Sequence, residues 1–479
     1  MYLGIDLGTS GVKAVLIGDD GAVAAQASAP LTVSRPQPLW SEQDPDDWWA
    51  ATEAAVLQLP GDLRAQVKAI GLAGQMHGAT LLGADHRPLR AAILWNDGRS
   101  SAECAALEAA VPDLREVAAN IAMPGFTAPK LAWVRAHEPR IFAATRKVLL
   151  PKDYLRLLMT GEAVSDMSDS AGTLWLDVAG RCWSDRLLAA TGLDRSHMPH
   201  LVEGTDIGGT LRAEVAARWG MGRVPVAGGA GDNAAGAAGV GVVRDGEALL
   251  SLGTSGVIFV ATNQLRANPA GAVHAFCHCL PGMWHQMSVH LSAASCLDWA
   301  GAMMGLAPAD LIAAAEAEGA GRGDELFLPY LSGERTPHND PAVRGALLGL
   351  GFDSSPGRIA ATVLEGVAFA HADGLAALTA AGTRIERLAV IGGGARSHFW
   401  GTIIAAALGV RLDYLAGGEV GPALGAARLA QIAATGAAPA DICIAPPVEH
   451  SITPDPALAE RLAPKLARFR AAYAAIKTV

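Results

Sequence analysis

Apolar segments of two kinds alternate along this chain of 479 residues. Short apolar runs bounded by turn residues predict buried strands at 67–73, 91–94, 224–227 and 388–391. Apolar residues at helical spacing predict helices at 46–59, 358–378 and 398–408. The first helix follows Asp44-Pro45, a capping residue with proline in the first turn. Strands that alternate with helices are typical of α/β proteins, in which helices cover sheets.

One motif occurs twice, about half the chain apart. Residues 6–15 read DLGTSGVKAV, and residues 251–260 read SLGTSGVIFV. In both copies a β-rich run meets Gly-Thr-Ser-Gly and continues into a second β-rich run, which predicts a hairpin with a tight turn. One copy alone would be an ordinary turn, whereas two copies that each open one half of the chain favour a duplicated fold. We expect two lobes, at 1–245 and 246–479.

Length, composition and charge restrict the class of protein. A chain of 479 residues is too long for one hydrophobic core, in agreement with two lobes. Hydrophobic residues make up 51% and charged residues 18%, which is typical of a globular protein. The net charge of −10 argues against a nucleic-acid partner, which needs a basic face. It permits a phosphorylated ligand held by backbone N–H groups and a cation.

Membrane and export signals are not expected. The apolar stretch 248–265 is interrupted by glycine, serine and threonine and predicts strand, turn and strand, not a membrane span. Residues 1–6 read as a strand without the pattern of a secretory signal. Six cysteines, mostly scattered, fit a reducing compartment. We expect a soluble, cytoplasmic protein without a membrane partner. A structural role is favoured over a zinc site, because the spacing is not standard, for His274, Cys277, His278 and Cys279.

Asp6 lies inside an apolar strand, immediately before the first glycine turn. A buried carboxylate is costly unless a cation or hydrogen bonds compensate it. The second copy carries Ser251 at the matched position, so the fold does not itself require the carboxylate. We therefore favour a ligand, through water, of Mg²⁺ carrying nucleotide phosphates over an aspartate that only ties down the turn.

The two repeated turns are candidates for phosphate binding. Thr9 and Ser10 offer hydroxyls beside backbone N–H groups, and Lys13 adds positive charge within reach of the same surface. Thr254 occupies the equivalent turn and could act from the opposite lobe. Neither turn is a Walker A loop, because G-x-x-x-x-G-K-[ST] is absent.

Asp232 follows a run of glycines and precedes the helical pattern of 233–236. It could be a helix N-cap, or the general base that takes the proton of a substrate hydroxyl during phosphoryl transfer. The spacing alone favours neither. The turn Gly392-Gly393-Gly394 lies between a strand and a helix, where a flat ring or a phosphate can approach closely. It is not G-x-G-x-x-G, which argues against a dinucleotide site. The glycine-rich segment 417–422 could serve tight packing alone.

Two further clusters offer groups that polyol recognition needs. The sequence Gln75-Met76-His77-Gly78 brings an amide and an imidazole to the end of a predicted strand. Hydrogen-bonding groups beside an aromatic face occur at 95–97 together with Arg99. Each cluster on its own is equally compatible with an ordinary place in the core or on the surface.

Taken together, these motifs resemble the FGGY family of carbohydrate kinases over nearly the whole chain. The resemblance is carried by segments 4–10, 40–45, 75–78, 94–97, 127–131, 151–154, 229–233, 392–394 and 421–426. It implies two ribonuclease-H-like lobes of the actin-like ATPase fold, with the active site in the central cleft. The chain departs from the family's second signature at Arg358, where an acidic or amide residue is usual, and at Thr362, where Ala or Ser is usual.

The resemblance also implies an activity, the transfer of the γ-phosphate of ATP to a terminal sugar or polyol hydroxyl. It implies Asp232 as the catalytic base and Asp6 as the carboxylate for Mg²⁺ and ATP. The implied sugar contacts are Met76, His77, Asp232 and Asn233. The implied nucleotide contacts are Thr9, Ser10, Lys13, Thr254, Gly393 and Gly394.

Several alternatives stay open at this stage. The resemblance is strongest to the branch of the family that phosphorylates the 5-hydroxyl of D-xylulose, but D-ribulose, L-xylulose or another polyol would need only small changes in the pocket. A non-catalytic relative of the same fold, such as a chaperone, a filament subunit or a sugar-sensing regulator, is the alternative of another class. A homodimer agrees with the resemblance.

Overall fold

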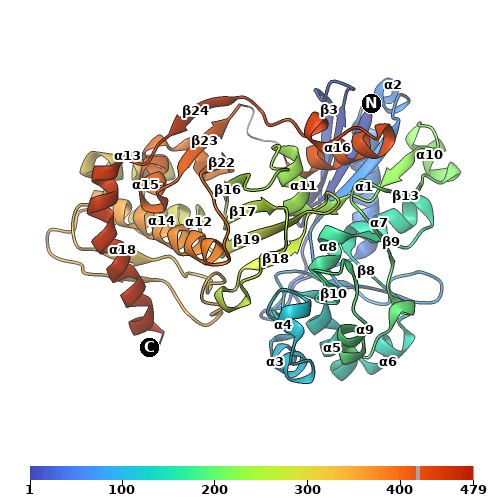
Figure 1. Cartoon of the computed structure of the whole chain (residues 1–479), viewed down its shortest axis with the longest axis horizontal. Coiled ribbons are helices and arrows are strands. Elements are labelled where there is room, and N and C mark those ends of the chain that lie inside the picture. The colour runs from blue at the N-terminus through green and yellow to red at the C-terminus, as the bar shows by residue number, and fades with distance from the viewer. Residues whose placement is uncertain (417–420, 478–479) are drawn as a thin grey trace.

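Two seven-stranded sheets form the centres of two lobes in the computed structural model, which describes residues 1–416 and 421–477 (Figure 1). The first sheet has the order β13-β14-β5-β1-β2-β3, with β15 paired to β5. Its strands are β1 (Tyr2–Leu7), β2 (Gly11–Ile17), β3 (Val23–Pro30), β5 (Ala69–Gly74), β13 (Ile207–Thr210), β14 (Pro225–Ala227) and β15 (Ala230–Gly231). The second sheet has the order β18-β19-β17-β16-β22-β23-β24. Its strands are β16 (Ala248–Leu252), β17 (Gly256–Thr262), β18 (His274–Cys277), β19 (Trp284–His290), β22 (Arg387–Ile391), β23 (Arg411–Leu415) and β24 (Val448–Ile452).

The repeated motif forms equivalent hairpins in the two sheets, which confirms the predicted duplication. β1 pairs antiparallel with β2 and places Asp6 opposite Lys13. β16 pairs antiparallel with β17 and places Ser251 opposite Val257. In each lobe the first strand of the hairpin also pairs in parallel with a later strand, β5 or β22. The turns of both hairpins therefore lie at the carboxyl edge of a parallel strand pair, where ligands of open α/β sheets commonly bind.

Helices surround both sheets. Those of the first lobe include α1 (Pro45–Gln58), α3 (Ser101–Ala110), α5 (Thr127–His137), α7 (Pro151–Thr160), α8 (Met167–Ala171), α9 (Asp185–Thr191), α10 (Ala213–Trp219) and α11 (Asp232–Gly239). Those of the second lobe include α12 (Ser295–Met304), α13 (Pro308–Glu318), α14 (Pro356–Ala380), α15 (His398–Leu408) and α18 (Pro456–Ile476). The helices predicted at 46–59, 358–378 and 398–408 are α1, α14 and α15. The predicted strands are β5, β7 (Ala92–Ile93), β14 and β22.

The predicted helix cap and the apolar stretches can be compared directly with the structure. The Asp44 side chain accepts a hydrogen bond from Asp46 N at the start of α1, as predicted. The stretch 248–265 contains the β16–β17 hairpin. Among the described residues α14 is the one helix long and apolar enough to cross a membrane, and 89% of that apolar window is buried inside the molecule. Thr362 lies on its buried part. Residues 274–279, which hold the two histidines and two cysteines, form β18 and the turn after it and are buried.

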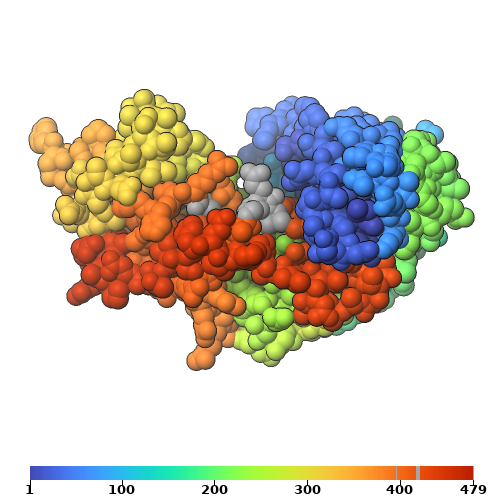
Figure 2. Space-filling model, turned by 90° about the horizontal axis from the view of Figure 1, so that it is seen from above, coloured from blue at the N-terminus to red at the C-terminus, as the bar shows by residue number. Residues whose placement is uncertain are grey.

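One helix from the second half of the chain packs on the first sheet. α16 (Pro422–Thr435) lies against β1 and β5, and it also contacts the short helix α17 (Pro439–Ile442) that follows it (Figures 1 and 2). A Cβ atom on Gly4 would lie 1.9 Å from the carbonyl oxygen of Ala423, and one on Gly71 would lie 1.9 Å from that of Ala426. The helix and strand backbones are therefore in direct contact. The division at 245/246 stays a prediction, and α16 packs across it.

The glycine-rich segment that precedes α16 is described only in part. Residues 417–420 lie outside the described residues, and Gly421 is the N-cap of the helix. Within α16, a Cβ atom on Gly425 would lie 1.8 Å from the carbonyl oxygen of Ala235 in α11. The glycine in this helix is thus required by tight packing against the helix that carries Asp232.

We expect Gly71→Ala to destabilise the protein by about 3 kcal/mol or more, because the new methyl group can be accommodated only if α16 moves off the sheet. The thermal midpoint of unfolding and the urea midpoint would measure this. Gly61→Ala is the matched control, since a Cβ atom there would meet only the far end of the Arg64 side chain at 3.6 Å. Equal midpoints for Gly71→Ala and the control would contradict the close backbone contact.

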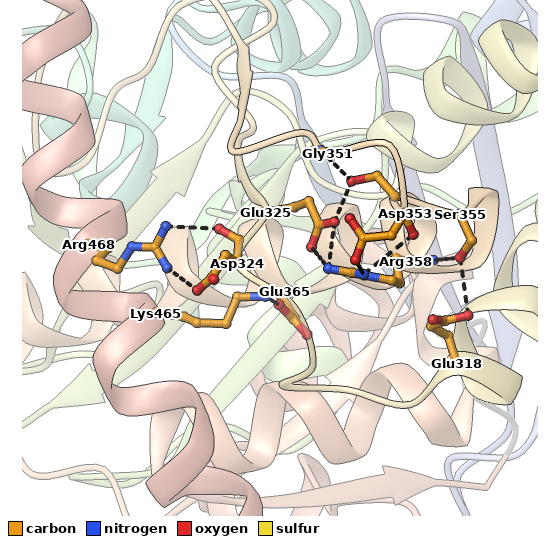
Figure 3. A network of polar contacts seen from close by, with 11 residues as sticks. Glu318, Asp324, Glu325, Gly351, Asp353, Ser355, Arg358, Glu365, Lys465 and Arg468 are labelled. Atoms are coloured by element: carbon orange, nitrogen blue, oxygen red, sulfur yellow. Dashed lines mark hydrogen bonds and ion pairs between the residues drawn. The ribbon is translucent and has the colours of Figure 1, made fainter.

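Arg358, one of the two residues that depart from the family's second signature, forms ion pairs in the second lobe. Arg358, in the first turn of α14, pairs with Glu325 at 2.8 Å and with Asp353 at 2.7 Å (Figure 3). Lys465 of α18 forms a buried pair with Glu365 at 2.5 Å in the same view. The arginine therefore anchors the start of a core helix, and its partners are not among the predicted site residues.

Candidate active site

Asp6 is the last residue but one of β1, at the carboxyl end of the strand. Its Oδ1 is buried and has no hydrogen-bond partner among the described residues. Burial and the nearby negative charge of Asp232 raise the pKa of Asp6 to about 7, against the opposing effect of Lys13. A buried carboxylate oxygen without a donor is suited to a hydrated cation. The residues present thus fit a magnesium ion bound beside Asp6.

Asp232 is the first residue of α11, and the N-cap is Gly231, so the N-cap interpretation of Asp232 is wrong. Its Oδ1 accepts hydrogen bonds from the backbone N of Asn233 at 2.7 Å and from Asn233 Nδ2 at 2.9 Å. Burial raises the pKa of Asp232 to about 6, although the bonds from Asn233 oppose this shift. At neutral pH the group is ionised and more basic than an ordinary aspartate, which suits proton abstraction.

Hydrogen bonds join the first repeated turn to both candidate sugar clusters. Trp95 Nε1 donates to Thr9 Oγ1 at 3.0 Å, and Thr9 Oγ1 donates to Gln75 Oε1 at 3.0 Å. Gln43 Nε2 donates to the Thr9 carbonyl oxygen at 2.7 Å. The Thr9 hydroxyl thus positions Trp95, while the neighbouring Ser10 is exposed.

His77 follows β5 in the left-handed region, at a φ of 67°. Burial and Lys130 lower the pKa of His77 to about 3, so the ring is neutral. Its Nδ1 lies 2.6 Å from the carbonyl oxygen of Gly172, to which it donates, and the lone pair of Nε2 can therefore accept from a hydroxyl. The ring packs against Phe126, at 4.8 Å between centroids, and faces Phe276 of the second lobe at 6.1 Å.

Met76 packs against Gly231, the residue that precedes Asp232. The side chain is buried, and a Cβ atom on Gly231 would lie 2.9 Å from its Sδ. A side chain at position 231 would therefore displace Met76. The structure thus brings Met76, His77, Asp232 and Asn233 into one region, on elements far apart in the sequence.

A buried polar network behind Asp232 was missed in the sequence. At its centre, Lys152 Nζ lies within 3.1 Å of carboxylates of three fully buried residues, Asp153, Asp166 and Asp169. Ser168 Oγ donates to Asp166 Oδ2 at 2.5 Å and accepts from Gly231 N at 3.2 Å. Such a network holds its members in one geometry. The Lys-Asp pair stands in segment 151–154, but nothing in the sequence places it behind Gly231.

Asp97 and Arg99, expected among polyol-binding groups, are engaged with each other. Their side chains pair at 2.7 Å and are almost fully buried. The guanidinium of Arg99 also stacks over Trp40 at 3.6 Å. These residues therefore fix the segment of Trp95, whose own side chain is 37% exposed.

The second repeated turn is anchored within its own lobe, and the triple-glycine turn is open. The carbonyl oxygen of Thr254 accepts from Ala293 N at 2.9 Å and from Ser295 Oγ at 2.8 Å, which anchors the turn near the start of α12. Gly392 has a φ of 94°, and a Cβ atom on Gly393 would meet nothing within 4 Å. The backbone here is open to a ligand.

Both lobes contribute to one cavity of about 340 Å³. Its lining includes Asp232, Asn233, Ser251, Phe259, Gly392 and Pro422. Figure 2 shows the hollow between the blue first lobe and the yellow and orange second lobe. The cavity thus contains both the candidate base, Asp232, and part of the triple-glycine turn that is expected to bind the nucleotide.

The two duplicated sheets, each opened by an equivalent hairpin, are those of the ribonuclease-H-like, actin-like ATPase fold, and Asp232 lies in the cavity that both lobes line. The family models for the N-terminal and C-terminal domains of the FGGY family of carbohydrate kinases match residues 1–239 and 248–434. The chain therefore belongs to the FGGY family and is a carbohydrate kinase, with ATP as the phosphate donor.

The relatives are similar along their whole length. The chain is 56% identical to a xylulose kinase of Escherichia coli K12, over 99% of this chain and 98% of the relative. It is 53% identical to a xylulose kinase of Klebsiella pneumoniae, over 100% and 99%. A solved structure from Brucella ovis, described as a xyloylose kinase, superposes with a TM-score of 0.96 at 52% identity and covers 100% of this chain and 99% of that one.

Proposed function

We propose that this protein transfers the γ-phosphate of ATP to the 5-hydroxyl of D-xylulose and releases D-xylulose 5-phosphate and ADP. The observation that carries the proposal is Asp232 in the cavity lined by both lobes, with the Asp6 carboxylate near enough for the charge of Asp232 to raise the pKa of Asp6. The choice of sugar is supported by relatives at 53% and 56% identity that are xylulose kinases.

Asp232 acts as the general base in this proposal. The sugar hydroxyl attacks the γ-phosphorus in line with the departing ADP oxygen, and the hydroxyl proton passes to the Asp232 carboxylate. Asn233, bonded to the same carboxylate, fixes its orientation. The proton leaves to solvent after the product does.

Charge on the transferring phosphoryl group is neutralised from both lobes. The N–H groups of Gly8 and Gly253 close their own turns, so the backbone N–H groups at 9–10 and 254–255 and the side chain of Lys13 supply the fixed positive potential. Asp6 would hold Mg²⁺ through water, and the ion supplies charge neutralisation when bound. Closure of the two lobes would exclude water and limit the hydrolysis of ATP.

A coupled assay of ADP release against a panel of sugars tests the proposal. The panel holds D-xylulose, D-ribulose, L-xylulose, xylitol and D-arabinitol, and we expect the highest kcat/KM with D-xylulose. A higher kcat/KM with another member of the panel would identify that sugar or polyol as the substrate and leave the kinase activity unchanged. Turnover of none would favour a non-catalytic relative of the fold. The homodimer stays a prediction that sedimentation of the full chain would test.

A further inference from the structure

We propose that Arg335, which reaches from the second lobe to the sugar side of the cleft, binds the carbonyl oxygen of an open-chain 2-ketose. The residue would thereby make the enzyme prefer ketoses to the corresponding polyols. The inference rests on the proposed sugar-kinase function and adds to it a residue that determines the class of substrate.

The first observation is the position of the guanidinium across the interface between the lobes. Its Nη2 lies 3.8 Å from the point where a Cβ atom on Gly125 would stand. Gly125 belongs to the first lobe, and the same point is 2.5 Å from the carbonyl oxygen of Trp95. Arg335 thus crosses from its own lobe to the segment of Trp95, the exposed indole held by the first repeated turn.

The second observation is an aromatic group that Arg335 shares with His77. The Nη1 of Arg335 lies 3.4 Å from Nε2 of His274. The His274 ring stacks on Phe276 at 5.5 Å and packs against Phe126 at 5.4 Å. Phe126 in turn packs against His77 at 4.8 Å. Arg335 and His77 therefore flank the same apolar wall, one from each lobe.

The third observation is that the guanidinium has no carboxylate partner among residues 1–416 and 421–477. The adjacent Glu334 directs Oε1 to the backbone N of Leu291 and of Arg335 itself, at 3.0 and 2.8 Å, and Oε2 to His290 at 3.3 Å. Within the described parts of the chain, the contact with His274 is the one hydrogen bond of the Arg335 side chain. The side chain is half-buried, and its unused donors stay accessible, so they are open to a ligand with lone pairs.

The chemistry of the two flanking groups is complementary. His77 is neutral, and its Nε2 can accept the hydrogen of a hydroxyl. Arg335 has donors only, and a carbonyl oxygen offers it lone pairs without a hydrogen that needs an acceptor of its own. A polyol hydroxyl can also accept from Arg335, but it must then place its own hydrogen, and a hydroxyl whose hydrogen faces an aromatic ring instead of His77 loses that bond. The loss of one such bond corresponds to about a 10- to 100-fold difference between the two substrate classes.

Two variants test the proposal with the full-length enzyme. Arg335→Met keeps the apolar stem and removes the donors, and Arg335→Lys keeps the charge but not the planar fork. We measure kcat/KM for D-xylulose, and for xylitol either kcat/KM or the inhibition constant against D-xylulose. Arg335→Met should lower kcat/KM for D-xylulose by about 10- to 100-fold, mainly through KM, and leave the xylitol constant within about threefold. Arg335→Lys should give an intermediate ketose-to-polyol ratio.

The control is Arg344→Met, an exposed arginine of the same segment whose guanidinium binds backbone carbonyl oxygens. It should leave both constants at wild-type values. Equal losses with ketose and polyol in Arg335→Met, at a wild-type thermal midpoint, would overturn the proposal and make the arginine a structural residue. If Arg335→Met fails to fold, an unchanged ketose-to-polyol ratio in Arg335→Lys would overturn it equally. A wild-type enzyme that turns over no sugar would instead refute the proposed kinase function, and one that prefers the polyol would overturn the inference together with the choice of D-xylulose as substrate.

Discussion

Asp232→Asn is expected to lower kcat for sugar phosphorylation by about 10²- to 10⁴-fold and to leave the KM of the sugar close to its wild-type value. The amide has the size of the carboxylate and can still accept the hydrogen bonds of Asn233, but it cannot take up the proton of the attacking hydroxyl. Steady-state measurement of ADP release at saturating ATP gives both constants. Asp62→Asn, in the first turn of an exposed helix, is the matched control.

The pH dependence provides an independent test of the same role. The base is active when ionised, and the pKa of Asp232 is raised to about 6. Activity should therefore fall as pH is lowered through about 6, well above the pH at which an ordinary aspartate protonates. The variant should lack this acidic limb. A variant with near wild-type kcat, or one that keeps the limb, would remove Asp232 from the role of base.

Asp6→Asn is expected to lower ATP-dependent turnover by about 10²-fold or more and to raise the Mg²⁺ concentration needed for half-maximal rate by about 10- to 100-fold. The physical reason is the loss of a buried carboxylate oxygen that has no donor of its own and is suited to a hydrated cation. Titration of free Mg²⁺ at fixed ATP measures the effect. Ser251→Ala, at the matched position of the second hairpin, should have a far smaller effect.

Asp6→Asn should increase the stability of the protein although it lowers turnover. Because the pKa of Asp6 is raised to about 7, its ionised form is disfavoured in the folded protein and stability falls as pH rises from its ordinary pKa through about 7. The neutral amide removes this penalty, so the thermal midpoint of the variant should exceed that of the wild type most clearly above pH 7. Unchanged turnover would make Asp6 a structural residue, and a lower midpoint above pH 7 would contradict the buried, repelled carboxylate.

The sequence by itself determined what depends on neighbouring residues. The bounds of α15 are those its apolar spacing predicts, and the two Gly-Thr-Ser-Gly turns form equivalent hairpins, because helical spacing and a tight turn are local properties. Comparison of the two copies of the repeat also shows which residues the hairpin itself requires. Asp6 and Ser251 occupy the same place in the two hairpins, so the carboxylate is not required by the hairpin.

Only the tertiary structure decided which distant residues meet. The packing of α16 on the first sheet, the support of Gly231 by Lys152 and its carboxylates, and the reach of Arg335 to the first lobe each join segments far apart in sequence. Their local patterns are those of an ordinary helix, an ordinary ion pair and an ordinary surface arginine. The meaning of each residue comes from burial and from the partner that burial brings within hydrogen-bond distance, and neither quantity is a property of a short stretch of chain.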